Sequence, residues 1–225
     1  MAHEYVAIVP ARGGSKGLAQ KNTRLLNGKP LYQYAVDQGG RTTSGVIVST
    51  DMQDILMSSQ PEGVILYERP AEFAQDTSPM DDVLRDAIVA NSLQGKVIVL
   101  LQVTSPLRTD LDVHAAIEVF ETGQFDLVQT VTLAERSVLK WGMRQGDQFV
   151  PLVTPEYCFQ NRQSLPEVFK PNGAVYVFSA DWFLENNGLA TDKIGLSEMP
   201  ANRSLDIDTL EDFDRVSEIM NSPKE

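Results

Sequence analysis

Two groups of residues at opposite ends of the chain have types and spacings suited to phosphate chemistry. The first is a loop rich in glycine and cations, residues 8–17 (IVPARGGSKG), which is followed by Lys21 and Asn22. The second is a pair of carboxylates, Asp206 and Asp208, separated by one apolar residue. The first pattern is suited to holding a polyphosphate, and the second is suited to holding a metal ion.

The glycine-rich loop lies at the centre of a cationic stretch in an acidic protein. The 225-residue chain has a formal charge of −12, yet no Asp or Glu occurs between Tyr5 and Val36. The cations of this stretch are Arg12, Lys16, Lys21, Arg24 and Lys29. Glycines let backbone N–H groups approach phosphate oxygens closely. Because no acid in the stretch balances the cations, we expect it to bind phosphate rather than only to link a strand to a helix.

Two common phosphate-binding motifs do not fit this loop. Its glycines are Gly13, Gly14 and Gly17, and the next expected helix begins only at Pro30, so the spacing differs from the dinucleotide-binding fingerprint. No Gly-Lys-Ser or Gly-Lys-Thr closes the loop, which excludes a Walker motif.

The carboxylate pair near the C-terminus is expected to bind a divalent cation. In an extended segment Asp206 and Asp208 share one face, while the neighbouring apolar residues point into the core. Two adjacent carboxylates repel each other unless a cation lies between them, and an all-oxygen site with room for water suits Mg²⁺. The alternative is that these acids favour the N-terminus of a helix. That alternative explains Glu211 and Asp212 well but Asp206 poorly.

Apolar runs alternate with helical patterns along most of the chain. The helix at 30–38 is expected to end at Gly39-Gly40, the helix at 110–121 to turn Leu111 towards the core, and Thr209 to cap the last helix with Asp212. Strands are expected at 5–9, 45–51, 64–67, 96–101, 127–132, 173–178 and 194–199, and helices at 30–38, 53–59, 79–92, 110–121, 180–186 and from 209. This order predicts an α/β fold with three layers and a mostly parallel sheet. Ligands then bind at the carboxyl ends of the strands.

The segment 134–171 interrupts this pattern. It alternates poorly, and it contains prolines and the aromatic residues Trp141, Phe149, Tyr157 and Phe159. We interpret it as a small β-rich excursion, so that residues 1–133 and 172–225 form the main domain. Apolar residues far from the main core often cover a partner subunit, which predicts a homodimer.

Composition excludes several other classes of protein. The acidic balance argues against nucleic-acid and anionic-membrane binding. Cys158 is the only cysteine, so neither an intrachain disulfide nor a cysteine-based metal cluster is possible. The longest apolar run is too short to span a bilayer, and the start of the sequence has no leader pattern. We therefore expect a cytoplasmic protein.

Considered together, the motifs resemble those of the acylneuraminate cytidylyltransferases, the CMP-sialic acid synthetases of the nucleotide-diphospho-sugar transferase fold. The resemblance extends over nearly the whole chain. It is carried by residues 8–17 with Lys21-Asn22, and by Ser49-Thr50-Asp51, Glu68-Arg69-Pro70-Ala71-Glu72, residues 101–108 (LQVTSPLR), Pro171-Asn172-Gly173-Ala174 and Asp206-Ile207-Asp208. It implies a Rossmann-like fold and the coupling of CTP to a nonulosonic acid, with release of pyrophosphate.

The resemblance also implies a role for each matching residue. Arg12, Lys21 and Asp208 would be catalytic, the two cations acting on the triphosphate. Nucleotide contacts would come from Ala11, Gly13, Ser15, Lys16, Asn22 and Arg69. The sugar pocket would consist of Gln102, Lys140, Arg162, Lys170 and Asn172, several of them on the excursion that crosses a dimer interface in this family. Asp206 and Asp208 would be the Mg²⁺ carboxylates.

Two positions depart from the family pattern. Lys170 stands where many members have Arg, which replaces a bidentate fork by a point charge, and Val103 replaces the usual proline. These departures concern the sugar rather than the reaction. N-acetylneuraminate is the first candidate substrate, with legionaminic and pseudaminic acids as alternatives. The Kdo-activating enzymes are disfavoured because they typically have an Arg-rich loop. A non-catalytic nucleotide-binding protein is disfavoured by the retained Asp206 and Asp208.

Overall fold

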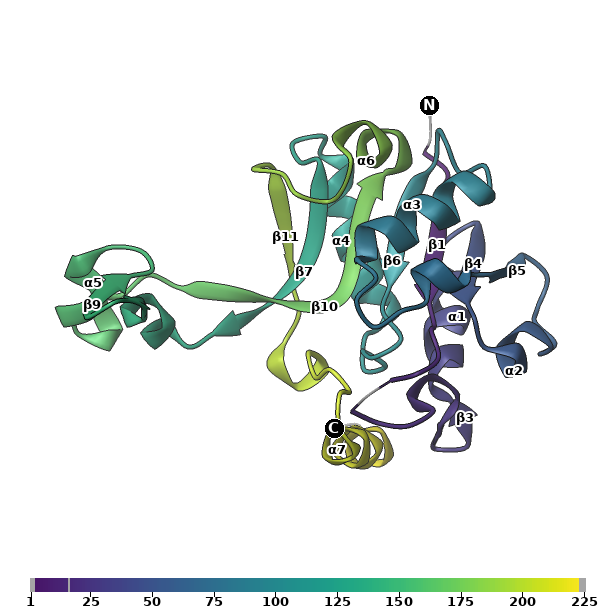
Figure 1. The fold of residues 1–225 in the computed structure, drawn as a ribbon, viewed down its shortest axis with the longest axis horizontal. Coiled ribbons are helices and arrows are strands. Elements are labelled where there is room, and N and C mark those ends of the chain that lie inside the picture. Colours follow the sequence, from purple (N-terminus) through teal and green to yellow (C-terminus); the bar gives the residue numbers. More distant parts are fainter. Residues whose placement is uncertain (1–2, 16, 223–225) are drawn as a thin grey trace.

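A seven-stranded sheet forms the centre of the protein (Figure 1). The computed structural model describes residues 3–15 and 17–222. The strand order is β11-β7-β10-β6-β1-β4-β5. Its strands are β1 (Tyr5–Pro10), β4 (Gly45–Thr50), β5 (Val64–Glu68), β6 (Val97–Leu101), β7 (Leu127–Ala134), β10 (Val168–Ser179) and β11 (Ile194–Glu198). Within the described ranges, no helix has the length and apolar character needed to cross a membrane.

One strand of the sheet runs against the others. β1 pairs in parallel with β4 and β6, β4 with β5, and β7 with β11, whereas β10 is antiparallel to both of its neighbours, β6 and β7. The strands were predicted from buried apolar runs, which are typical of a parallel sheet covered on both faces. The predicted α/β fold with a mostly parallel sheet is confirmed.

Helices cover both faces of the sheet, giving the three predicted layers. The helices are α1 (Leu31–Thr42), α2 (Gln53–Leu56), α3 (Met80–Ala90), α4 (Asp110–Glu121), α5 (Pro155–Phe159), α6 (Ala180–Asn186) and α7 (Leu210–Asn221). Successive strand residues point to opposite faces, so Ala7 and Val9 pack in one core with residues of α1, α4 and α7. Val6 and Ile8 pack in the other core with residues of α3 and α6.

Several predicted helix details are corrected. The helix predicted to end at Gly39-Gly40 continues to Thr42, because Gly39 is buried against the sheet and a helix tolerates glycine where packing requires it. Leu111 was predicted to face the core but is 77 % exposed. The helix expected at 53–59 is the single short helix α2. The predicted cap of α7 is confirmed, because Thr209 and Asp212 form a reciprocal capping box.

A small hairpin between the glycine-rich loop and α1 was not predicted. β2 (Leu25–Leu26) pairs with β3 (Lys29–Pro30). Both residues between them have positive φ, 48° at Asn27 and 84° at Gly28, the Asn-Gly combination that a tight hairpin turn requires. The hairpin folds the chain back, so that α1 begins one residue after the predicted Pro30.

The excursion lies away from the central sheet, at the end of the long strands β7 and β10 (Figure 1). It contains one hairpin, β8 (Gly142–Gln145) with β9 (Gln148–Pro151), together with α5 and short 3₁₀ turns. The division at 133/134 and 171/172 remains a prediction. β7 ends at Ala134, and β10 continues across 171/172, where its register on β7 shifts between Pro171 and Tyr176.

Adjacent glycines of α1 provide a test of this packing. A Cβ at Gly39 would lie 2.9 Å from the Cβ of Ala7 and 3.0 Å from Cγ2 of Val46, whereas a Cβ at Gly40 meets nothing within 4 Å. Gly39→Ala should lower the free energy of unfolding by about 1–2 kcal/mol through overpacking. Gly40→Ala should raise it by about 0.5–1 kcal/mol through helix propensity. Urea denaturation measures both, and equal effects of the two substitutions would contradict the packing.

Candidate functional site

A cavity of roughly 150 Å³ opens where β1 and β6 end. It lies at the carboxyl ends of parallel strands, the edge at which such folds bind ligands. Its lining includes several predicted site residues: Arg12, Ser15, Lys21, Asn22, Arg69 and Gln102. The remaining lining residues are Pro10, Met80, Val103 and Thr104. Segments far apart in the sequence therefore meet at the place that the strand pattern predicted.

Backbone and side-chain hydrogen bonds hold the glycine-rich loop above β1. The buried Ala11 donates its N–H to the carbonyl of Ser49 at 2.9 Å. Gly13 donates its N–H to Oδ1 of Asp51 at 2.7 Å. The amide of Asn22, which is buried, donates to the carbonyl of Arg12 at 2.8 Å, so in this structure it braces the loop. Lys16, a predicted nucleotide contact, lies outside the described residues.

Lys21 joins this loop to the carboxylate pair near the C-terminus. Its Nζ donates to the carbonyl of Ile207 at 2.7 Å and to Oδ1 of Asp208 at 3.2 Å. The loop and the acidic segment approach closely here, because a Cβ at Gly17 would collide with the carbonyl oxygen of Asp208. Only glycine fits that approach without displacing the backbone. The two groups of residues that suggested chemistry are thus in direct contact.

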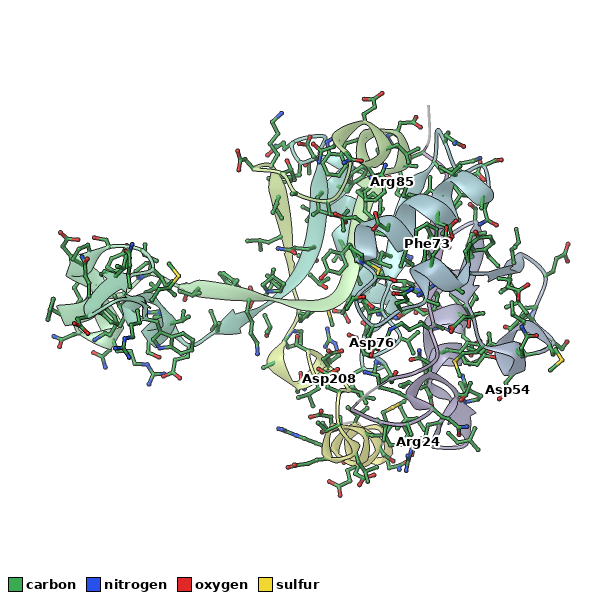
Figure 2. All side chains as sticks on the ribbon, viewed as in Figure 1. Arg24, Asp54, Phe73, Asp76, Arg85 and Asp208 are labelled. Carbon is green, nitrogen blue, oxygen red and sulfur yellow. The ribbon has the colours of Figure 1, made fainter. Side chains whose placement is uncertain are left out.

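Acids from distant segments pair with two cations of the stretch, although the stretch itself contains no acid. Arg12 pairs with Asp76 at 2.6 Å, and Lys21 pairs with Asp208. Figure 2 shows Asp76 and Asp208, both near the lower ends of the strands. An incoming polyphosphate would have to exchange with these carboxylates.

Arg69 forms the wall on the β4 side of the site. Its guanidinium donates from Nε to Oγ of Ser49 at 3.0 Å and from Nη2 to the carbonyl of Ser49 at 2.8 Å. Desolvation lowers the pKa of Arg69, the nearby charge of Asp51 opposes this shift, and the charge of Arg12 adds to it. Arg69 also lines a neighbouring cavity of roughly 650 Å³ with Asp51 and the start of the following loop. It therefore separates two adjoining spaces at the strand ends.

Asp206 carries a perturbed carboxyl group. Desolvation raises its pKa, a hydrogen bond with the Thr104 side chain opposes the rise, and the charge of Asp208 adds to it. The residue keeps an exposed face, so crowding by neighbouring protein, rather than full burial, causes this desolvation. The backbone N–H of Ile207 donates to the carbonyl of Thr104 at 2.9 Å, and the Ile207 side chain is fully buried. The segment is therefore fixed to the end of β6.

The donor chemistry of this pair fits Mg²⁺. Among the described residues, no group of three or more His, Cys, Asp or Glu side chains is arranged to hold a metal ion. Two carboxylates with mutually unfavourable charge form an oxygen-only pair that leaves the other positions to water and phosphate oxygens, as Mg²⁺ usually requires. Asp206 and Asp208 could thus hold Mg²⁺ together with a bound nucleotide.

The residues predicted to bind the sugar do not meet within one chain. Gln102 lines the cavity, but Lys140 and Arg162 lie on the excursion, where Lys140 donates to the carbonyl of Gln160 and Arg162 pairs with Glu135. Lys170 is exposed on β10. Asn172 is buried, and protein atoms engage its amide: Oδ1 accepts from Oγ1 of Thr130 at 2.7 Å, and Nδ2 donates to Oγ of Ser204 at 2.9 Å.

Sequence reasoning missed several supporting residues. Arg108 is buried and donates to the carbonyls of Gln102 and Ala174 at 3.1 Å and 2.6 Å, which ties the end of β6 to β10. Arg108 lies in the motif at residues 101–108, and that motif could have identified it from the sequence. No local signal exists for Asp76, because its partner Arg12 lies in another segment.

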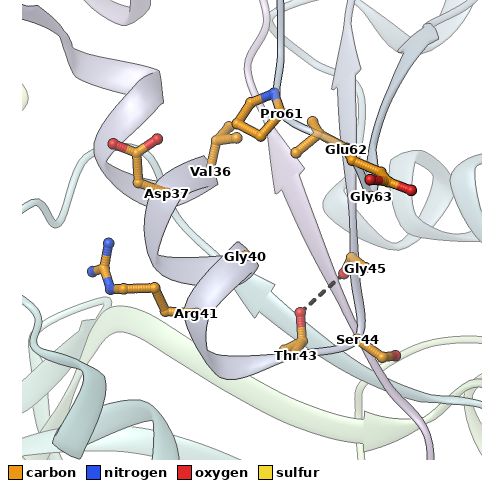
Figure 3. A pocket seen from close by; sticks show the side chains of 11 residues that line it. Val36, Asp37, Gly40, Arg41, Thr43, Ser44, Gly45, Pro61, Glu62 and Gly63 are labelled. Atoms are coloured by element: carbon orange, nitrogen blue, oxygen red, sulfur yellow. Dashed lines mark hydrogen bonds between the residues drawn. The ribbon is translucent and has the colours of Figure 1, made fainter.

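A further cavity of roughly 300 Å³ lies between α1 and the starts of β4 and β5 (Figure 3). Thr43 donates its hydroxyl to the carbonyl of Gly45 at 2.9 Å within it. None of the predicted site residues lines this cavity. It lies at the amino ends of the parallel strands, the edge opposite to the one that binds ligands in such folds.

Comparison with known proteins identifies the family of the chain. Residues 6–185 match the family described as Cytidylyltransferase. The flagellin modification protein B of Campylobacter coli is 28 % identical over 93 % of this chain and 92 % of its own length. The CMP-N,N'-diacetyllegionaminic acid synthase of Campylobacter jejuni is 29 % identical over 99 % of both. The N-acylneuraminate cytidylyltransferase of Streptococcus agalactiae serotype V is 29 % identical over 92 % of this chain, which spans only 51 % of that relative.

Solved structures share the fold. The CMP:2-keto-3-deoxy-manno-octonic acid synthetase complexed with CTP has a TM-score of 0.72 at 17 % identity, covering 96 % of this chain and 98 % of its own. The 4-diphosphocytidyl-2C-methyl-D-erythritol synthase of Anaerococcus prevotii has a TM-score of 0.65 at 14 % identity, covering 98 % and 99 %. At these identities, both likenesses concern the fold alone.

The raised pKa of Asp206 predicts a pH-dependent stability in metal-free buffer. The folded state holds this proton more tightly than the unfolded state, so stability falls as pH rises from 3.8, the ordinary Asp value, through the higher folded pKa. Asp206→Asn should therefore gain stability relative to the native protein, and the gain should be larger at pH 7 than at pH 4. Urea denaturation with EDTA at both values measures it.

Asp110 provides a control of opposite sign. Its hydrogen bond from Arg41 lowers its pKa, so Asp110→Asn should lose stability, by an amount that changes little between pH 4 and pH 7. An Asp206→Asn difference that stayed equally constant over this range would contradict the raised pKa.

Proposed function

The chain belongs to the cytidylyltransferase family, and we propose that it couples CTP to a nonulosonic acid, giving a CMP-sugar and pyrophosphate. One observation carries the proposal. The cationic loop and the carboxylate pair, nearly two hundred residues apart in sequence, are joined through Lys21 beside a cavity at the strand ends. A polyphosphate site and a metal-ligating pair in contact are what nucleotidyl transfer requires.

N-acetylneuraminate is the first candidate for the acceptor sugar. The acylneuraminate cytidylyltransferase motifs of the sequence and the Streptococcus relative support it. Legionaminic acid is the main alternative, because the Campylobacter jejuni relative aligns over 99 % of both chains and its name specifies that product. Pseudaminic acid and Kdo complete the series. All are acidic sugars, so the acceptor needs a cation for its carboxylate.

The chain's own residues would act by positioning and by charge neutralisation. The anomeric hydroxyl oxygen of the sugar forms a bond to the α-phosphorus of CTP, loses its proton, and the bond to the bridging α–β oxygen breaks, so that pyrophosphate leaves. Arg12 and Lys21 would exchange their carboxylate partners for phosphate oxygens and stabilise the charge that develops there. Arg69 and Asn22 would line the nucleoside end of the cavity.

We propose that Mg²⁺ is the cofactor and that Asp206 and Asp208 hold it. When bound, such an ion neutralises phosphate charge and lowers the pKa of a coordinated hydroxyl. Asp208 would then pass from Lys21 to the metal, which frees the Lys21 ammonium for the triphosphate.

The acceptor pocket is proposed to form between two subunits of a homodimer. Lys140 and Arg162 lie on an excursion that extends away from the cavity holding Gln102. The excursion also exposes large apolar side chains, among them Trp141 and Phe159, which is 91 % exposed. Such a surface supports a subunit contact.

CTP is a cytoplasmic nucleotide, and we propose that the reaction takes place in the cytoplasm.

The proposed function is tested by pyrophosphate release from CTP and Mg²⁺ with each nonulosonic acid in turn. The sugar that gives the largest kcat/KM identifies the substrate, and release that no sugar stimulates would leave only a nucleotide-binding protein. In the same assay Lys21→Ala and Asp208→Asn should each lower turnover by on the order of 10²-fold. Lys29→Ala is the matched control, since Lys29 belongs to the same cationic stretch but pairs with Asp37 outside the cavity.

The dimer proposal predicts complementation between two inactive variants. Lys21→Ala removes a group of the phosphate loop, and Arg162→Ala removes a group of the excursion. If each site combines a loop from one subunit with an excursion from the other, the co-expressed variants should regain about one quarter of native activity, since half of the dimers would be mixed and each would keep one intact site. Activity no higher than that of either variant alone would contradict a shared site.

A further inference from the structure

We propose that the ion pair between Asp112 and Arg203 is a positioning device for the metal-ligating carboxylates, setting the affinity of the site for Mg²⁺. Arg203 directly precedes the acidic segment, defined as residues 204–208, and Asp112 lies in the first turn of α4. Neither residue lines the cavity at the strand ends. The inference deepens the proposed function, on which its metal-binding part rests.

The pair has a bidentate geometry. Nη2 of Arg203 donates to Oδ1 of Asp112 at 2.6 Å, and Nε donates to Oδ2 at 3.2 Å. A fork of this kind fixes direction as well as distance. Asp112 is buried, and its Oδ2 also accepts from the backbone N–H and the hydroxyl of Thr109, at 2.8 Å and 2.7 Å. The carboxylate is thus held rigidly by the capping box of α4 and serves as an anchor.

The electrostatics keep the anchor charged. Desolvation raises the pKa of Asp112, but the hydrogen bonds from Arg203 and Thr109 outweigh it, so the net shift is downward. Asp112 therefore remains ionised at neutral pH. The Asp112 side chain is only 6 % exposed, so its charge alone would be poorly solvated, and it therefore stabilises the position of the Arg203 guanidinium strongly.

The acidic segment depends on such external contacts, because it has no helix or strand of its own. Arg203 holds its start. Further along, Ser204 accepts from the amide of Asn172, and Ile207 donates to the Thr104 carbonyl. At its end Asp212, in the capping box of α7, accepts the N–H of Asp208 at 3.1 Å. The capping box of α4 therefore holds the start of the acidic segment through Arg203, and the capping box of α7 holds its end through Asp208.

Loss of the Arg203 contact should lower the fraction of molecules in which Asp206 and Asp208 are placed to bind a metal ion. Asp206 and Asp208 repel each other in the absence of a cation, so an untethered segment would favour conformations that separate them. The apparent dissociation constant for a metal rises as the competent fraction falls. Loss of an outer contact that orients metal ligands typically weakens metal affinity by about 10- to 100-fold. Removing the Arg203 fork should act through this route.

The chain contains a matched control on the same helix turn. Arg41 donates to Asp110 from Nε at 2.7 Å and from Nη2 at 2.8 Å, which is also a bidentate pair with the first turn of α4. It joins α4 to α1 instead of to the acidic segment. Arg41→Met therefore removes a more exposed ion pair of the same geometry and leaves the acidic segment unchanged.

The first experiment is hydrogen exchange of the metal-free protein, which does not depend on the proposed function. Arg203→Met should speed exchange at the amides of Ile207 and Asp208 by about tenfold or more, because their local opening becomes easier. Arg41→Met should leave these two amides unchanged. Unchanged exchange at both amides in Arg203→Met would overturn the proposal.

The second experiment measures the Mg²⁺ dependence of pyrophosphate release. Arg203→Met should raise the half-saturating Mg²⁺ concentration by about tenfold, while kcat at saturating Mg²⁺ stays within about twofold of native. Arg203→Lys, which keeps the charge but loses the fork, should give an intermediate increase, and it carries the test if Arg203→Met fails to fold. If Arg203→Met lowered the melting temperature but left the half-saturating Mg²⁺ concentration unchanged, the ion pair would have only a structural role and the proposal would be wrong. An inactive native protein would instead refute the proposed function, leaving the exchange result to decide the positioning role.

Discussion

The contact of Lys21 with the end of the acidic segment is the interaction on which the site depends. One ammonium group bridges the carbonyl of Ile207 and the carboxylate of Asp208, and so joins the loop after β1 to a segment that precedes the last helix. Several neighbouring features support this contact. Gly17 allows the backbones to meet, the Asn22 amide braces the loop, and the end of β6 holds Ile207 from the other side. The site therefore joins an N-terminal loop to a C-terminal segment of the chain.

The reversed direction of strand β10 determines where the excursion leaves the central sheet. Because β10 is antiparallel to β6 and β7, it enters the sheet from the same edge at which the parallel strands end. Its first half can therefore continue beyond the sheet and carry the excursion, while its second half completes the core with Val175 and Val177. A parallel strand in that place would have started at the opposite edge. The direction of one strand thus places the excursion, with the proposed sugar-binding residues, at the edge where the parallel strands end.

The fold was largely predictable from sequence because its strands are buried on both faces and two of its helices have capping boxes. Both features are local: the run at Val97–Leu101 and the Thr209–Asp212 box each lie within a few residues. The side-by-side placement of Asp206 and Asp208 followed from alternation alone. The ion pairs were not predictable, because Asp76 and Arg203 find their partners through tertiary structure, and long-range charge pairs leave no periodic trace. Gly39 was misinterpreted for the same reason, since its packing against Ala7 outweighs its low helix propensity.

Under the proposed function, in which Arg12 binds the triphosphate, its ion pair with Asp76 has a consequence for product release. An internal carboxylate that occupies a phosphate-binding cation behaves as a tethered competitive inhibitor. Its effective concentration is constant, so it discriminates against weakly charged ligands and yields only to one that offers several negative oxygens. In the proposed reaction, the carboxylate of Asp76 would pair again with the guanidinium of Arg12 as pyrophosphate leaves. Asp76 would then act as an internal anion that displaces the product and favours turnover over its retention.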